Sequence, residues 1–183
     1  MADHLVEADL VAALDEVRRS PSDHGTLELI VRRPEVDQRE VCGVGELSTE
    51  VGLVGDSWNQ RSSRRTDDGG PHPDMQLNVM NARFLRQIAG SEERMALAGD
   101  QLIVDLDLSD ANLPPWTKLS IGDAVIEVTD QPHQGCAKFT QRFGLDAHRF
   151  VNSELGVELH LRGINARVVT PGTIRVGDTI TKL

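Results

Sequence analysis

The sequence predicts a mainly β fold, in which short antiparallel strands form a barrel or a sandwich with a few short helices around it. Two observations favour this class: Gly-Asp turns recur along the chain, and short alternating strands adjoin them. The segments "LAGDQLIVDL", "LSIGDAVIEV" and "IRVGDTITKL" each place Gly-Asp directly before an alternating strand, and "GLVGD" ends at Asp56 in the same way. Glycine tolerates a positive φ and aspartate bonds nearby backbone, so Gly-Asp is typical of a turn that enters a strand. Several short strands separated by such turns are typical of antiparallel barrels and sandwiches.

The N-terminal segment differs from the rest because its apolar residues follow a helical period. Residues 4–19 are predicted to form a helix, which Ser20-Pro21 ends. Its apolar residues at helical spacing are Leu5, Val6, Leu10, Val11, Leu14 and Val17. We therefore expect an N-terminal helical extension over residues 1–25, followed by one β domain over residues 26–183.

The β domain begins with the strand "TLELIVRR" (26–33), and "EVCGVGELSTEVGLVGD" (40–56) is predicted to contain two short strands. Residues 57–74 are polar and rich in glycine and proline, which indicates a long loop of the kind that is often functional. "MQLNVM" (75–80) is a predicted strand. Short helices are predicted over "NARFLRQIA" and "SEERMALA", the second capped by Ser91.

Composition excludes several classes of function. A net charge of −10 and an aromatic content of 3% argue against nucleic acid and anionic membranes as partners. No apolar run approaches the roughly 20 residues that span a bilayer, and the N-terminus does not resemble a signal peptide. With two cysteines, the expected location is a reducing cytoplasm. The GxGxxG, GxxxxGK[ST] and GxSxG motifs are not found, which leaves the common nucleotide and hydrolase assignments without support.

The segment "DQPHQGCAKFTQRFG" places Cys136 in a loop-like stretch, with Lys138 and Arg142 just behind it. Residues 133–175 contain six basic and three acidic residues within a chain of net negative charge. Nearby cations favour a thiolate, and they would suit a phosphate-bearing cofactor. Solvated surface residues are the alternative explanation of the basic cluster. Cys42 lies in a strand pattern and fits a buried structural role better.

Two other chemistries have weaker support. His133 and Cys136 have the spacing of zinc ligands, but the sequence has no second close pair to complete a site. A Cys-His hydrolase would need His133, His148 or His160 as its base, and nothing in the sequence orients one of them.

The second half of the chain resembles the MOSC domain, the C-terminal domain of molybdenum-cofactor sulfurases. The matching features occur in the order of that family: Gly122-Asp123, Cys136, Arg162-Gly163, Ala166-Arg167-Val168, and Gly172 through Gly177-Asp178. "GLVGDSW" (52–58) and "QLNVMNARF" (76–84) extend the resemblance to about residues 26–183. The chain is similar to a small stand-alone member, without the pyridoxal-phosphate domain or the extra N-terminal barrel of larger relatives.

The resemblance implies a β-barrel with short helices and a pocket at the cysteine loop. It implies that Cys136 carries sulfur as a persulfide or binds molybdenum of the molybdenum cofactor, with a redox or sulfur-donor protein as a further partner. The residues expected to bind the cofactor are His133, Lys138, Arg142, Arg162, Asn165, Arg167, Asp56 and Trp58. Gly135 departs from the family, where many members have proline before the cysteine.

Alternatives remain open for several of these residues. Ile164, Ala166 and Val168 share one strand face, so Arg167 points the other way, either into a pocket or to solvent. "RSSRR" (61–65) is either a loop that closes over an anion or a solvated segment. The function is either oxidoreductase or sulfur-transfer chemistry at Cys136, or non-catalytic binding and delivery of a cofactor or small anion. In each case we expect Cys136 to border a concave pocket with a cation in its wall.

Overall fold

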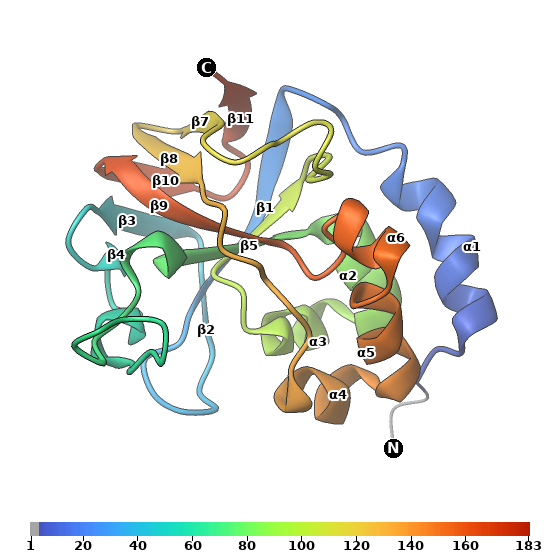
Figure 1. Cartoon of the computed structure of the whole chain (residues 1–183). Helices are drawn as coiled ribbons and strands as arrows, with labels where there is room; N and C mark the ends of the chain where they lie inside the picture. Colours follow the sequence, from blue (N-terminus) through green and yellow to red (C-terminus); the bar gives the residue numbers. More distant parts are fainter. Residues whose placement is uncertain (1–3) are drawn as a thin grey trace.

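The computed structural model describes residues 4–183, and its centre is a closed barrel of seven strands (Figure 1). Neighbouring strands follow the order β1-β11-β7-β8-β9-β5-β6, and pairing of β6 with β1 closes the ring. The barrel strands are β1 (Gly25–Arg32), β5 (Leu77–Asn81), β6 (Leu102–Asp105), β7 (Lys118–Ile121), β8 (Ala124–Val128), β9 (Ile164–Thr170) and β11 (Thr179–Lys182). The mainly β fold with peripheral helices is therefore confirmed, and it is a barrel.

All neighbouring pairs in the barrel are antiparallel except β5 and β6, which are parallel. A parallel pair needs a crossover connection. Here that crossover is made by α2 (Ala82–Ala89), α3 (Glu92–Met95) and the 3₁₀ turn η3 (Ala96–Ala98).

A second, smaller sheet adjoins the barrel. It consists of β10 (Gly172–Arg175), β3 (Val44–Ser48) and β4 (Gly52–Leu53), while β2 (Glu40–Cys42) pairs with the end of β1. Residues 40–56 thus form three short strands where the sequence predicted two, because Gly43 separates β2 from β3.

The barrel interior is aliphatic. Leu27, Leu77, Leu102, Ile126 and Ile164 are among the side chains that fill it. Cys42 is half-buried against this core, and burial raises the pKa of its thiol, as expected for a structural cysteine.

The helices gather on one side of the barrel around a second core (Figure 1). Met80 and Ile103 on the outer face of β5 and β6 contribute to it, and it contains all four phenylalanines of the chain. Besides α2 and α3, the helices are α1 (Glu7–Val17), α4 (Ala137–Phe143), α5 (Leu145–Val151) and α6 (Glu154–Glu158).

The N-terminal helix is shorter than the predicted residues 4–19, and its apolar face is narrower. Leu10, Leu14 and Val17 are buried as expected, whereas Val6 and Val11 are exposed. Val6 precedes the helix, and Val11 is turned away from the α2 and α5 surfaces on which α1 packs. Among residues 4–183, no helix has the length and apolar character to cross a bilayer.

The predicted Gly-Asp turns are confirmed, because Gly55, Gly99, Gly122 and Gly177 all have positive φ. Residues 57–74 are largely irregular, as predicted, with the 3₁₀ turns η1 (Trp58–Gln60) and η2 (Pro73–Met75) at the two ends. The predicted cap was wrong in one detail: Ser91 occupies the first position before α3, but its side chain makes no capping hydrogen bond.

Candidate functional site

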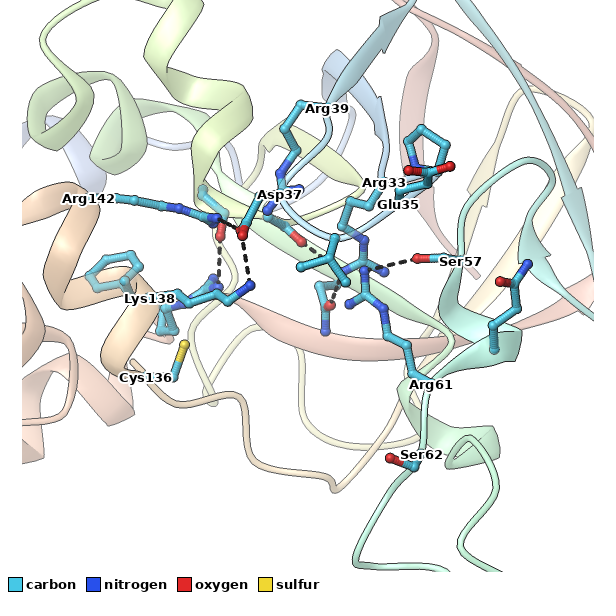
Figure 2. Close-up of a pocket in the computed structure, with 18 residues that line it drawn as sticks. Arg33, Glu35, Asp37, Arg39, Ser57, Arg61, Ser62, Cys136, Lys138 and Arg142 are labelled. Atoms are coloured by element: carbon cyan, nitrogen blue, oxygen red, sulfur yellow. Dashed lines mark hydrogen bonds and ion pairs between the residues drawn. The ribbon is translucent and has the colours of Figure 1, made fainter.

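A cavity of about 1140 Å³ lies between the β1–β2 connection, residues 57–62 and α4 (Figure 2). Cys136 is part of its wall, as are Asn78 and Gly99. The charged side chains in the wall are Arg33, Glu35, Asp37, Arg39, Arg61, Lys138, Arg142 and Arg162. Six of these eight are basic and two acidic, so the wall carries a net charge of +4 within a chain of net charge −10.

The Cys136 thiol is free and exposed, and it stands at the residue directly before α4. The preceding Gly135 is fixed from both sides: its N–H donates to Asn152 Oδ1 at 3.0 Å, and its carbonyl oxygen lies 3.1 Å from His148 Nε2. A β-carbon at position 135 would lie 3.0 Å from Asn152 Nδ2 and 3.1 Å from His148 Cδ2. Proline at this position would lose the N–H donor and crowd both side chains, which gives the departure from the family pattern a structural reason.

Arg33 forms the floor of the cavity through a buried ion pair. Its Nε and Nη2 donate to the two oxygens of Asp56 at 2.7 and 2.8 Å, and Nη1 donates to Asn78 Oδ1 and the Gly99 carbonyl. The Asp56 side chain is fully buried and also accepts from the backbone N–H of Trp58. This bidentate pair therefore neutralises Arg33 and fixes the start of residues 57–62.

Arg162 is neutralised in the same way. Its Nη1 lies 2.7 and 2.9 Å from the two oxygens of the fully buried Asp100, and its guanidinium packs over the Phe139 ring. His133 lies next to this pair, with Nδ1 3.6 Å from Asp100 Oδ1 and without a hydrogen bond. Burial, with Arg162 and Arg33 nearby, holds the pKa of His133 well below its usual value. His133 is therefore neutral at pH 7.

Arg39 and Arg61 differ from these two arginines, because within residues 4–183 neither forms an ion pair. Arg39 Nε is buried without a hydrogen-bond partner. Burial and the neighbouring Arg142 and Arg33 lower the pKa of Arg39. Arg61 is exposed, but partial desolvation, with Arg33 and Arg39 nearby, lowers its pKa to about 10. Both guanidinium groups stay charged at pH 7 in surroundings that disfavour the charge, which an anionic ligand would relieve.

Lys138 and Arg142 reach the cavity from α4 and share one carboxylate. Lys138 Nζ and Arg142 Nη2 each donate to Asp37 Oδ1 at 2.9 Å (Figure 2). Arg142 is held further by the Leu97 carbonyl oxygen, to which its Nη1 donates at 2.7 Å.

The remaining residues predicted for the site lie outside this wall. Arg167 is on the outer side of β9, where it pairs with Glu127 and Asp74 and lies over Trp116. The solvent-facing alternative for Arg167 therefore describes its position.

Two smaller cavities adjoin the first, and three other predicted residues, His133, Asn165 and Trp58, line them. One of about 170 Å³, behind the cysteine loop, is lined by His133, His160 and Asn165, and it shares Arg162 with the main cavity. Another, of about 160 Å³, is lined by Trp58 and His72 and shares Arg61.

Sequence reasoning missed Arg33 and Arg39 and treated Arg61 as one of two alternatives. Arg61 belongs to "RSSRR", whose glycine- and proline-rich surroundings were the available signal. Arg33 and Arg39 flank the β1–β2 connection and carry no motif, so only the fold reveals their role.

The weaker chemistries gain no geometric support. Within residues 4–183, no three His, Cys, Asp or Glu side chains cluster as a metal site. The wall of the main cavity, in this same range, contains no histidine that could act as a base for Cys136.

Comparisons with known proteins agree with this architecture. The family model described as "MOSC domain" matches residues 72–181. A search of curated proteins found no match.

Several solved structures share the fold. The YUAD protein from Bacillus subtilis is 14% identical with a TM-score of 0.58, over 86% of this chain and 94% of that one. YiiM from Escherichia coli is 20% identical with a TM-score of 0.55, over 86% of this chain and 69% of that one. YiiM from Geobacillus stearothermophilus is 13% identical with a TM-score of 0.55, over 87% and 75%.

The matched residues make up more than half of the chain, and they include the cysteine loop, α4 and most of the barrel strands. The solved structures share this fold, with TM-scores of 0.58 and 0.55. The chain therefore belongs to the MOSC domain family.

Proposed function

We propose that the protein binds the molybdenum cofactor in the main cavity, with the cofactor's phosphate group on Arg39 and Arg61 and the Cys136 thiolate as a ligand of molybdenum. One observation carries the proposal: an exposed thiol shares one cavity with two guanidinium groups that have no carboxylate partner among residues 4–183.

The residues present fit such a group. The buried Arg39 Nε has no partner of its own within residues 4–183, and a phosphate oxygen would provide one. Thiolate is a soft ligand suited to a transition metal. The cavity, at about 1140 Å³, is slightly larger than the roughly 300–1,000 Å³ usual for ligand pockets, so it has room for a ligand of cofactor size.

The protein's own residues would position the ligand. Arg39 and Arg61 would bind its anionic end, while the rigid pairs Arg33–Asp56 and Arg162–Asp100 shape the cavity. Gly135, fixed by Asn152, sets the direction from which Cys136 meets the ligand. When bound, the cofactor would supply a metal centre that exchanges electrons with a substrate.

Sulfur transport is a second candidate, favoured by the exposure of Cys136. In this role the cysteine would carry sulfur as a persulfide and meet a sulfur-donor protein at the open cavity. A non-catalytic role in binding or delivering a cofactor would use the same residues, and in the redox role the partner would be an electron donor.

Elemental analysis of protein purified from a host that makes the cofactor tests the proposal. Wild type should retain molybdenum at about one atom per chain, and Cys136→Ser should lose most of it because an alkoxide is a poorer soft ligand. Cys42→Ser, which changes the half-buried thiol, should retain the metal. Wild type without molybdenum would contradict the proposal, and an added sulfur atom on Cys136 in its mass spectrum would then favour sulfur transport.

A further inference from the structure

Asp37 is the only carboxylate in the cavity wall of the described residues that forms ion pairs with cations from another segment of that wall. It lies in the connection between β1 and β2, with a positive φ of 62°. One of its oxygens, Oδ1, accepts from both Lys138 and Arg142 on α4, so its side chain joins two walls of the cavity (Figure 2).

The loop that carries Asp37 is largely exposed, and the Asp37 side chain itself is 62% exposed. Glu35, Val36 and Gln38 are exposed, Val36 by 80%. Glu35 also belongs to the cavity wall, yet it forms no ion pair with a cation of residues 4–183. Of the two acidic residues in the wall, only Asp37 therefore occupies a binding position for an anion.

Lys138 and Arg142 are the cations that pair with Asp37, and Arg142 lies next to Arg39, which has no ion-pair partner within residues 4–183. A β-carbon built on Gly99 would lie 3.4 Å from Arg39 Nη2 and 3.7 Å from Arg142 Nη1. The two guanidinium groups thus converge on the same point of the backbone. Without Asp37, the cavity would present two adjoining cationic positions, Arg39 with Arg61 and Lys138 with Arg142, and a ligand with two phosphate groups could use both.

We infer that Asp37 is an internal anion that occupies the Lys138–Arg142 position and makes the cavity select ligands with one phosphate-like group over diphosphates. The inference rests on the proposed function only for the identity of the natural ligand. The selection follows from charge: a second phosphate must either displace the Asp37 carboxylate or lie beside it, and both are unfavourable.

Calorimetric titration with inorganic phosphate and pyrophosphate tests this inference. Wild type should bind one phosphate per chain, and Arg61→Gln should weaken that binding. Asp37→Asn should bind two phosphates, and its affinity for pyrophosphate should rise about tenfold or more, the effect of charge-assisted hydrogen bonds gained at the freed pair. Glu35→Gln is the matched control, because it removes the same charge from the wall without freeing Lys138 and Arg142.

The outcomes separate this inference from the proposed function. If Asp37→Asn matches Glu35→Gln in stoichiometry and in pyrophosphate affinity, Asp37 does not select the ligand. Wild type that binds no phosphate, or binds pyrophosphate as tightly as Asp37→Asn, would overturn the inference as well. The expected phosphate results together with wild type that lacks molybdenum would overturn the proposed function alone. Asp37→Asn should stay folded in thermal unfolding, because ion pairs of an exposed carboxylate contribute little to stability.

Discussion

The arginines of the cavity have two different roles, and the role of each depends on whether its guanidinium group pairs with a buried carboxylate. Arg33 and Arg162 each face a fully buried carboxylate, so removing Asp56 or Asp100 would leave a buried charge unpaired, which typically costs about 3–5 kcal/mol. Among the described residues Arg39 has no such partner, so we expect its charge to be available to a ligand. The buried pairs shape the cavity, and we expect the guanidinium groups of Arg39 and Arg61 to give it affinity for anions.

The two cysteines should differ in reactivity for a related reason. Cys136 is exposed in the wall of a cationic cavity, whereas burial raises the pKa of Cys42 and so lowers its thiolate fraction. We expect brief treatment with iodoacetamide at neutral pH to alkylate Cys136 first, by at least about tenfold in rate. Peptide mass spectrometry measures both sites in one sample. Equal labelling, or faster labelling of Cys42, would show that Cys136 is not the reactive thiol.

The start of strand β9 depends on a single glycine, Gly163. Gly163 follows Arg162 with a φ of 101°, and a β-carbon there would collide with the Val79 carbonyl oxygen of β5. This close approach lets β9 pair with β5 directly after the arginine that pairs with Asp100.

Alanine at Gly163 should therefore destabilise the fold by about 2–4 kcal/mol, the combined effect of the left-handed backbone and the collision. Gly177→Ala is the matched control, since its φ of 96° is similar but, apart from its chain neighbours, no atom of residues 4–183 lies within 4 Å of the added carbon. We expect that variant to lose only about 1–2 kcal/mol, the effect of the backbone alone. Urea unfolding of both proteins measures the difference, and equal losses would show that the contact with Val79 is unimportant.

The elements that the sequence predicted well are those that local chemistry specifies. The four Gly-Asp turns were recognisable because a positive φ and a turn aspartate leave a signature within two residues. The exposure of Val6 and Val11 was not predictable in this way, since it depends on how α1 packs against α2 and α5. The extra strand in residues 40–56 likewise depends on pairing with β10, about 130 residues later in the chain.

At the scale of the whole molecule, the site is assembled where the barrel, the β1–β2 connection and α4 meet (Figure 1). The sequence predicted Cys136, Lys138, Arg142 and Arg162 for the site, because a family pattern and a local excess of basic residues identify them. It could not predict that Arg33 and Arg39, which precede Cys136 by more than 90 residues, line the same cavity. Nor could it place Arg167 on the outer side of β9, where Glu127 and Asp74 hold it.

We expect one ligand to bridge Cys136 and the Arg39–Arg61 pair. Anomalous diffraction at the molybdenum edge, from crystals of protein purified from a cofactor-producing host, would locate it. We expect one anomalous peak within bonding distance of Cys136 Sγ and phosphate density between the two guanidinium groups. A molybdenum peak away from Cys136, or an empty cavity in protein that retains the metal, would contradict the claim.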